Sequence, residues 1–290
     1  MFVFWIKGNK ALARHNEYTK PHNSSLYTSD DFTSFSLLKN FSGSAGEYYV
    51  SPDNEQILFF TGDSNSTLKG IWKSTDQGKN WYNVFEETVD KLFFVQNDSF
   101  QIYALKNRKE VGADIFVSKD NGETWYKEST IKDVASASRL AVNPFNQKQK
   151  IITARNGLWV TSDNGITWTN KYSESEPTGV AFNPCNPNEA YFTSHFGLYQ
   201  ISYGKINKIN FSEKDGIPVP SSLIFKPDSS TAYFLSETDK KDLYKVNSKK
   251  VDKITTFESE DPVTLIFDSA NPDILFCIGL KEIVKLSFRP

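Results

Sequence analysis

The chain has 290 residues, and its 33 basic and 35 acidic side chains leave a formal net charge of −2. This balance excludes a general electrostatic attraction to nucleic acid or to an anionic membrane. No apolar run reaches the ~18 residues of a membrane-spanning helix. Aromatic residues make up 14% of the chain and Met1 is its one methionine, which favours an all-β protein built from many packed strands.

Short apolar runs recur along the chain with a period of 40–45 residues. The first unit begins at Phe2–Ile6, and its equivalent in the second unit is Tyr48–Val50. Each unit contains further runs of this kind, so that it reads as four strands joined by turns. The run before the last turn of each unit lies at Leu26-Tyr27, Ile71-Trp72, Ile115-Phe116, Leu158-Trp159, Leu198-Tyr199, Leu243-Tyr244 and Ile283-Val284.

Seven four-stranded units predict one all-β domain, a seven-bladed β-propeller of antiparallel blades. A single blade cannot bury both of its faces, and stacking gives each sheet two apolar neighbours. The expected blades cover residues 1–43, 44–88, 89–133, 134–174, 175–215, 216–258 and 259–290.

One motif, Ser/Thr-x-Asp-x-Gly-x-x-Trp, occurs three times at intervals of 44 and 43 residues. An Asp-x-Gly turn between two strands favours a β-hairpin, because glycine accepts a positive φ and aspartate binds nearby backbone amides. The motif residues are Ser74, Asp76, Gly78 and Trp81; Ser118, Asp120, Gly122 and Trp125; and Thr161, Asp163, Gly165 and Trp168.

This pattern resembles the Asp-box (BNR) repeat of the propellers in sialidases, xyloglucanases, sortilin-type receptors and photosystem II assembly factors. The resemblance implies that the aspartate fixes the turn between the third and fourth strands and that the tryptophan packs between blades. It also implies that the motif lies on the face opposite the ligand site. The resemblance therefore predicts architecture and says little about activity.

The other units depart from the motif. The first has Thr28-Ser-Asp-Asp-Phe-Thr-Ser-Phe35, which aligns in two ways that differ by one residue. The fifth and sixth have short turns at 202–205 and 247–250. The seventh has no room for a fourth strand. Its blade has three strands, or takes Phe2–Ile6 as the fourth, or belongs to a longer chain; we favour closure by contacts between the terminal blades.

Candidate ligand residues lie on the loops opposite the motif. Arg155 and His195 occupy equivalent positions in adjacent units, and Arg14 is placed similarly in the first. An arginine and a histidine at the mouth of a channel are suited to an anion or a sugar carboxylate. The alternative is that these side chains cap strand ends or pair with loop carboxylates.

The loops between units are acidic and favour a cationic partner or a metal ion if they share one face. This interpretation competes with the anion site, and we favour the alternative that these exposed loops are charged for solubility. The acids are Glu86, Glu87, Asp90, Glu128, Asp133, Glu174, Glu176, Glu213, Asp215, Glu258, Glu260 and Asp261.

Catalytic signatures are weak. The chain has five arginines and no Arg-Ile-Pro sequence, which argues against a sialidase. A glycoside hydrolase needs two carboxylates across a cleft, and the acidic loops keep that alternative open. Cys185 and Cys277 lie two blades apart, so no disulfide is expected. With three histidines and no ligand spacing, we expect no metal and no cofactor.

The sequence thus predicts a non-catalytic binding propeller that recognises a protein or glycan partner through its loop face. The alternatives are a carbohydrate-active glycoside hydrolase and one propeller module of a larger sortilin-like receptor. We expect a monomer that binds no nucleic acid. A secreted or periplasmic location is expected if a signal peptide has been removed, and a cytoplasmic one otherwise.

Overall fold

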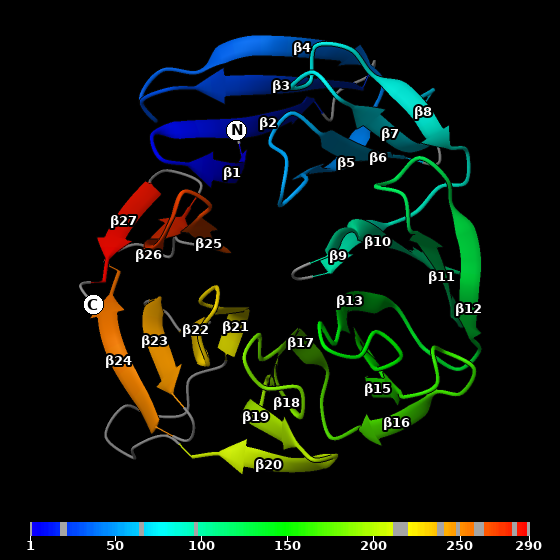
Figure 1. The fold of residues 1–290 in the computed structure, drawn as a ribbon, viewed down its shortest axis with the longest axis vertical. Coiled ribbons are helices and arrows are strands. Elements are labelled where there is room, and N and C mark those ends of the chain that lie inside the picture. Colours follow the sequence, from blue (N-terminus) through cyan, green and yellow to red (C-terminus); the bar gives the residue numbers. More distant parts are fainter. Residues whose placement is uncertain are drawn as a thin grey trace. The chain divides into compact units, whose positions relative to one another are not determined.

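The fold is that of a seven-bladed β-propeller, which confirms the predicted all-β class (Figure 1). The computed structural model describes residues 2–17, 22–63, 67–95, 98–210, 220–236, 241–247, 250–257, 264–279 and 283–288. Every regular element within these ranges is a β-strand. The strands form seven antiparallel sheets, each built from strands consecutive in sequence. Among the described residues, six sheets have four strands and the last has three, β25 to β27.

A first compact unit contains nearly all of the first three sheets and the short segment Asp268–Asn271. Its strands are β1 (Phe2–Lys7), β2 (Lys10–Glu17), β3 (Asn23–Ser29) and β4 (Ser36–Ser42); β5 (Ala45–Val50), β6 (Leu58–Gly62), β7 (Gly70–Ser74) and β8 (Tyr82–Phe85); and β9 (Lys91–Val95), β10 (Asp98–Asn107), β11 (Ala113–Ser118) and β12 (Tyr126–Ile131).

A second compact unit contains most of the remaining chain. Its strands are β13 (Ala137–Val142), β14 (Lys150–Ala154), β15 (Gly157–Thr161) and β16 (Thr169–Tyr172); β17 (Pro177–Phe182), β18 (Glu189–Ser194), β19 (Gly197–Ser202) and β20 (Lys205–Ile209); β21 (Pro220–Phe225), β22 (Thr231–Ser236), β23 (Asp242–Asn247) and β24 (Lys250–Thr256); and β25 (Thr264–Asp268), β26 (Asn271–Ile278) and β27 (Ile283–Ser287).

The burial of each strand follows from its place in its sheet. The second strands are nearly continuous apolar runs and are buried throughout, as in β6 and β14. The outer strands alternate or are exposed, as in β8 and β20. A strand covered on both faces needs apolar residues at every position, whereas an outer strand contacts solvent.

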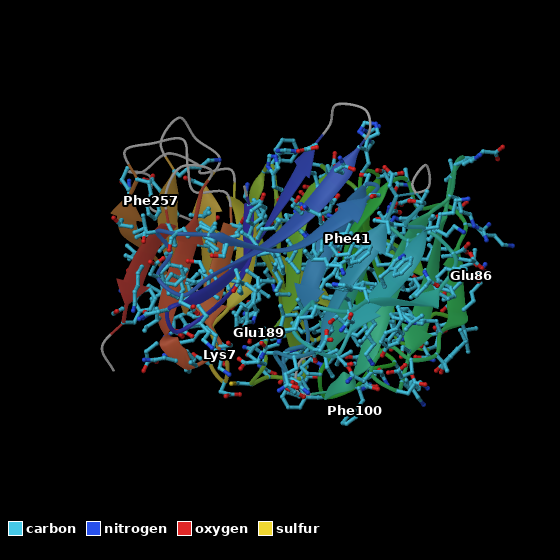
Figure 2. All side chains as sticks on the ribbon, turned by 90° about the horizontal axis from the view of Figure 1, so that it is seen from above. Lys7, Phe41, Glu86, Phe100, Glu189 and Phe257 are labelled. Atoms are coloured by element: carbon cyan, nitrogen blue, oxygen red, sulfur yellow. The ribbon has the colours of Figure 1, made fainter. Side chains whose placement is uncertain are left out.

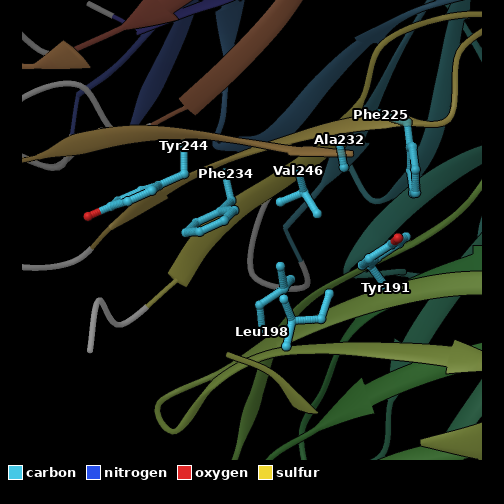
Figure 3. Close-up of a cluster of buried hydrophobic side chains, with 8 residues drawn as sticks. Tyr191, Leu198, Phe225, Ala232, Phe234, Tyr244 and Val246 are labelled. Atoms are coloured by element: carbon cyan, nitrogen blue, oxygen red, sulfur yellow. The ribbon is translucent and has the colours of Figure 1, made fainter. Parts of the chain in front are cut away.

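The core is divided into layers between neighbouring sheets. One layer joins the fifth and sixth sheets, where Tyr191 and Leu198 pack against Phe225, Ala232 and other side chains of the sixth (Figure 3). The rings of Tyr191 and Phe225 lie 5.4 Å apart in an edge-to-face arrangement. Burial of such aromatic surface stabilises a fold by ~25 cal/mol per Å², so these layers hold each unit together.

The strand β1 pairs with β2 as the first strand of its own sheet. It is therefore not the fourth strand of the seventh sheet, one of the three alternatives for that sheet. The β1–β2 turn is instead bonded to the last residue of β25 and to the residue that follows it. The Gly8 amide donates to Asp268 Oδ1 over 2.9 Å, and Ser269 Oγ donates to the Ile6 carbonyl over 3.4 Å. That the whole chain forms one domain stays a prediction.

Each four-stranded sheet has two ends that differ in the turns they carry. The first-to-second and third-to-fourth strand turns lie at one end, which we call the motif end. The second-to-third strand turn and the link to the next sheet lie at the other, which we call the loop end. In the first unit, Lys7 and Phe100, both next to first-to-second strand turns, lie at the same edge (Figure 2).

Candidate functional site

The three motif turns, residues 74–81, 118–125 and 161–168, are closed by one hydrogen-bond pattern. In the second turn, Ser118 Oγ accepts from the buried Gly122 amide over 2.8 Å. Asp120 Oδ1 accepts from the Thr124 amide over 2.9 Å, and Thr124 Oγ1 donates to Asp120 Oδ2 over 2.5 Å. Ser74 with Asp76, and Thr161 with Asp163, make equivalent bonds. The turn polar groups are therefore bonded to one another.

The same bonds lower the pKa of the motif aspartates. The pKa of Asp76 falls to about 2 because the Asn80 backbone and side chain donate to it. The pKa of Asp163 falls to about 2 through the side chain and backbone of Thr167. For Asp120 desolvation raises the pKa, but the Thr124 hydroxyl and amide outweigh it and bring the pKa to about 2. A general acid needs a raised pKa, so these three carboxylates are unsuited to that role.

The motif tryptophans contact the layers between sheets. The Trp81 ring lies 5.7 Å from Phe41 of the first sheet and 5.0 Å from Phe60 of the second. Trp125 lies 6.0 Å from Phe85. Trp168 is half-buried. Gly78 and Gly122 have φ values of 87° and 82°, in the left-handed region that glycine accepts.

The first sheet has a shorter version of this turn, and the structure decides between its two alignments. Asp31, not Asp30, accepts from the Thr33 and Ser34 amides, each over 2.8 Å. Ser29 takes the serine position and accepts from the Phe32 amide over 3.0 Å. The alignment starting at Thr28 was therefore one residue out of register.

Arg14 lies within β2, away from any turn. Its guanidinium donates to the Gly46 carbonyl at the start of the second sheet and lies 5.5 Å from the centre of the Phe2 ring. These contacts correspond to the alternative that it caps a strand. The structure places Arg14 in the first compact unit, and Arg155 and His195 in the second.

Arg155 and His195 lie on the tight turns β14–β15 and β18–β19 at the loop end of adjacent sheets. The pairings Ala154–Gly157 and Ser194–Gly197 close the two turns identically. Both side chains are exposed, and neither bonds to another residue in the described part of the chain. Phe196 beside His195 is 51% exposed. The two turns thus present a cation, an imidazole and an aromatic ring to solvent.

The backbone beneath these side chains is fixed by hydrogen bonds. The Arg155 amide donates to the Ala135 carbonyl over 2.9 Å. Asn156 accepts from the Ala135 amide over 3.0 Å and donates to the Asp133 carbonyl over 2.7 Å. On the next turn, the Phe196 amide donates to Ser194 Oγ over 3.1 Å. Asn156 thus ties the link from the third sheet to the fourth.

A cluster of hydroxyl groups below the His195 turn was missed from the sequence. The Tyr172 hydroxyl donates to the Tyr199 hydroxyl over 3.1 Å and lies 3.2 Å from Ser194 Oγ and 3.3 Å from Ser175 Oγ. Burial and the Tyr172 bond raise the pKa of Tyr199. The two tyrosines belong to different sheets and to no motif, so they gave no signal, because the cluster forms only when the sheets stack.

The acidic loops are only partly gathered into a surface. Glu87 is paired with Lys106 over 2.8 Å, and Asp90 accepts from the Asn107 amide over 2.6 Å. Glu174 and Glu176 are exposed at the loop end beside the Tyr172 cluster. The acids of the last loops, namely Glu213, Asp215, Glu258, Glu260 and Asp261, lie outside the described residues.

No cluster of three metal-ligating side chains occurs among the residues that the structure describes. Cys185 is exposed and Cys277 is buried, and both are free thiols; burial raises the pKa of Cys277 to about 12. The described ranges include no helix long and apolar enough to span a membrane.

Solved structures with this fold include enzymes and a checkpoint assembly. The GH74 xyloglucanase of Xanthomonas campestris is 12% identical with a TM-score of 0.66, over 98% of this chain and 51% of that chain. An ancestral GH74 enzyme is 14% identical with a TM-score of 0.61, over 85% of this chain and 37% of that chain. A chain of the mitotic checkpoint complex is 13% identical with a TM-score of 0.65, over 98% of this chain and 88% of that chain. At these identities the likeness shows the fold alone.

Sequence comparison is more specific. The vacuolar protein sorting/targeting protein PEP1 of Saccharomyces cerevisiae is 21% identical over 164 residues, in strains RM11-1a and AWRI1631 among others. The match covers 54% of this chain but spans only about a tenth of that relative's length. The Sortilin-Vps10 family model, described as sortilin, neurotensin receptor 3, matches residues 113–261. This match covers just over half of the sequence, and the chain therefore belongs to the Sortilin-Vps10 family.

Proposed function

We propose that this chain is a non-catalytic binding module that recognises a protein partner through the loop end of its fourth and fifth sheets. The observation that carries the proposal is the pair of identical turns that expose Arg155 and His195 while their backbones are held by hydrogen bonds. A rigid scaffold that presents exposed side chains binds without the entropic cost of ordering a loop.

Family membership supports a protein partner rather than a glycan. The name of the PEP1 relative describes protein sorting and targeting, and we transfer to this chain only the recognition of a protein. Because the chain matches about a tenth of that relative, we further propose that it acts as the propeller module of a larger sorting receptor. Phe196 adds an exposed aromatic ring, and phenylalanine is enriched at protein interfaces relative to the rest of the surface.

Selection of a random peptide library on the immobilised chain, followed by affinity measurement, tests this proposal. We expect the selected peptides to bind the wild type and to lose about tenfold or more in affinity, ~1.4 kcal/mol, in the double variant Arg155→Ala with His195→Ala. Lys208→Ala is the matched control, because Lys208 is an exposed cation on the outer strand β20 of the same unit.

Two results would contradict the proposal. Equal loss of affinity in the Lys208→Ala control would mean that only general charge attracts the peptides. Release of defined fragments from xyloglucan, another β-glucan or a sialoside, abolished by Glu174→Gln or Glu176→Gln, would make the chain a glycoside hydrolase acting through its exposed loop carboxylates.

A further inference from the structure

An apolar pocket of about 240 Å³ opens between the fourth and fifth sheets at the motif end, opposite the Arg155 and His195 turns. The fourth sheet contributes strands β14 and β15 to its wall, and the fifth contributes β17, β18 and the β19–β20 turn. The apolar lining includes Ile151, Val160, Phe182, Ala190, Ile201 on β19, and Tyr203.

The equivalent space between the second and third sheets is filled by a side chain of the protein itself. Lys73 is 2% exposed, and its Nζ lies 5.7 Å from the centre of the Phe59 ring. Its Nζ donates to the Asn121 carbonyl over 2.7 Å and to Glu123 Oε1 over 2.5 Å, both in the motif turn of the third sheet. A four-carbon stem with a paired ammonium therefore closes this position.

The strand register shows why the space between the fourth and fifth sheets stays open. Phe59 pairs with Lys73 in the second sheet, and Ile151 pairs with Val160 at the same step of the fourth. Val160 therefore stands where Lys73 stands, but its side chain ends two carbons and an ammonium earlier. The fifth sheet also lacks a motif tryptophan, since its turn runs directly from Gly204 into β20.

Tyr203 occupies a strained position at the rim of this pocket. Its amide donates to the Asn188 carbonyl over 3.1 Å, as the Asn121 amide donates to the Phe100 carbonyl over 2.9 Å. Tyr203 thus takes the place of Asn121, with a φ of 48°, and a glycine follows each. A bulky residue in the left-handed region is a costly choice, yet here it leaves an aromatic side chain 78% exposed.

The charges around the pocket select an uncharged occupant. Glu123, which balances Lys73, follows Gly122, whereas Lys205 follows Gly204 at the equivalent place. Two charged residues also line the pocket, but Lys150 Nζ donates to Asn164 Oδ1 over 2.6 Å and Glu189 accepts from Gln200 over 3.0 Å. A second ammonium would lose its water beside the buried Lys150 ammonium, and the Glu189 carboxylate already accepts from Gln200, so the desolvation cost would be high.

We propose that this pocket is a second binding site, which takes one apolar, leucine-like side chain from an extended segment of a partner protein. The volume fits one side chain, and the homologous position shows that a side chain is what fills it. Phe145 and Ile166, 53% and 84% exposed, lie on turns at the same end of the fourth sheet and extend the apolar surface. This site is independent of the loop-end proposal.

Titration of methyl-labelled protein with N-acetyl-leucinamide and N-acetyl-lysinamide, followed by NMR, tests the proposal. We expect saturating shifts at the methyl groups of Ile151, Val160 and Ile201 with the leucine probe. The lysine probe should bind at least about fivefold more weakly, because its ammonium would lose water in a pocket that already holds the Lys150 ammonium. Val160→Phe should abolish the shifts at Ile151 and Ile201 by filling the pocket.

Two further variants separate loss of the site from loss of the fold. Thr28→Phe makes the same change at the equivalent step of the first sheet and should leave leucine-probe binding intact. Tyr203→Asn relieves the turn and should weaken binding without lowering stability. Absence of saturating shifts in the wild type, equal binding of the two probes, or unchanged binding by Val160→Phe would each overturn the proposal.

Discussion

The third-to-fourth strand turns of the third and fifth sheets share a backbone conformation but differ in their residues. Both place two consecutive residues at positive φ, Asn121-Gly122 at 58° and 82° and Tyr203-Gly204 at 48° and 75°. In both, the amide of the first of these residues donates to a carbonyl in or next to the first-to-second strand turn, Phe100 in the third sheet and Asn188 in the fifth. The third sheet adds a buried serine, an aspartate and a tryptophan around this pair, whereas the fifth adds nothing.

The conformation of the backbone turn is therefore separable from its packing against the neighbouring sheet. Gly122 lies against the preceding sheet, because a Cβ built on it would be 2.5 Å from the Phe59 ring, whereas a Cβ on Gly204 would meet nothing within 4 Å. The third-sheet turn is thus part of the core, and the fifth-sheet turn forms the rim of an open pocket.

Gly122→Ala should destabilise the fold more than any other single change at these turns. The new methyl group would collide with the fully buried Phe59 ring in addition to straining the backbone, so we expect a loss of about 2–5 kcal/mol. Gly204→Ala shares the positive φ without the collision and should cost about 1–2 kcal/mol. Urea unfolding of the two variants measures the difference, and equal losses would show that the packing contact contributes nothing.

Ser118→Ala should cause the next largest loss of folding stability. It removes the oxygen that accepts from the buried Gly122 amide, and an unpaired buried donor costs about 1–3 kcal/mol. Ser202→Ala, at the end of the third strand of the fifth sheet, should stay within about 0.5 kcal/mol. The same unfolding measurement checks both, and a loss as large for Ser202→Ala would contradict the role given to the motif serine.

The fold could be predicted because its signals are local and repeated. The spacing of runs such as Ile71-Trp72 and Leu158-Trp159 places one third strand in each sheet, and Gly78, Gly122 and Gly165 mark the turns that follow. Each signal is weak alone, but its repetition at a fixed period indicates a repeat architecture. The alignment at Asp31 stayed open by one residue in the sequence, because that turn has neither the glycine nor the tryptophan that would fix it.

The candidate site was harder to predict because it depends on side-chain environment. Arg14 and Arg155 look equivalent in sequence, yet Arg14 is bonded to the Gly46 carbonyl and Arg155 is exposed. The pocket beside Val160 arises from what is missing in the fifth sheet, and its relation to Lys73 appears only once strand register is known. Contacts between sheets join residues that are distant in sequence, and the spacing of motifs does not predict them.

Lowering the pH should reduce the free energy of unfolding through the motif turns, by less than the substitutions above. Urea unfolding between pH 7 and 2 measures this effect. The motif aspartates have a pKa of about 2 in the folded state, below the unfolded value of about 3.9. Their stabilisation is complete above pH ~4 and is lost as pH falls through ~2. The triple variant Asp76→Asn, Asp120→Asn, Asp163→Asn should be less stable at neutral pH but lose less stability between pH 4 and 2. A parallel decline in both proteins would contradict this assignment.

Tyr203→Asn should have the smallest effect, and its sign is the informative part. Asparagine accepts positive φ more readily than tyrosine, and Asn121 and Asn164 already occupy this position in two motif turns. We expect a gain of about 0.5–1 kcal/mol, part of the cost of a bulky residue in the left-handed region. The exposed ring makes few contacts whose loss would offset this gain. A rise in the urea midpoint would mean that tyrosine stands here at the expense of stability, as expected for a residue that serves binding, whereas a fall would show that its ring stabilises the fifth sheet.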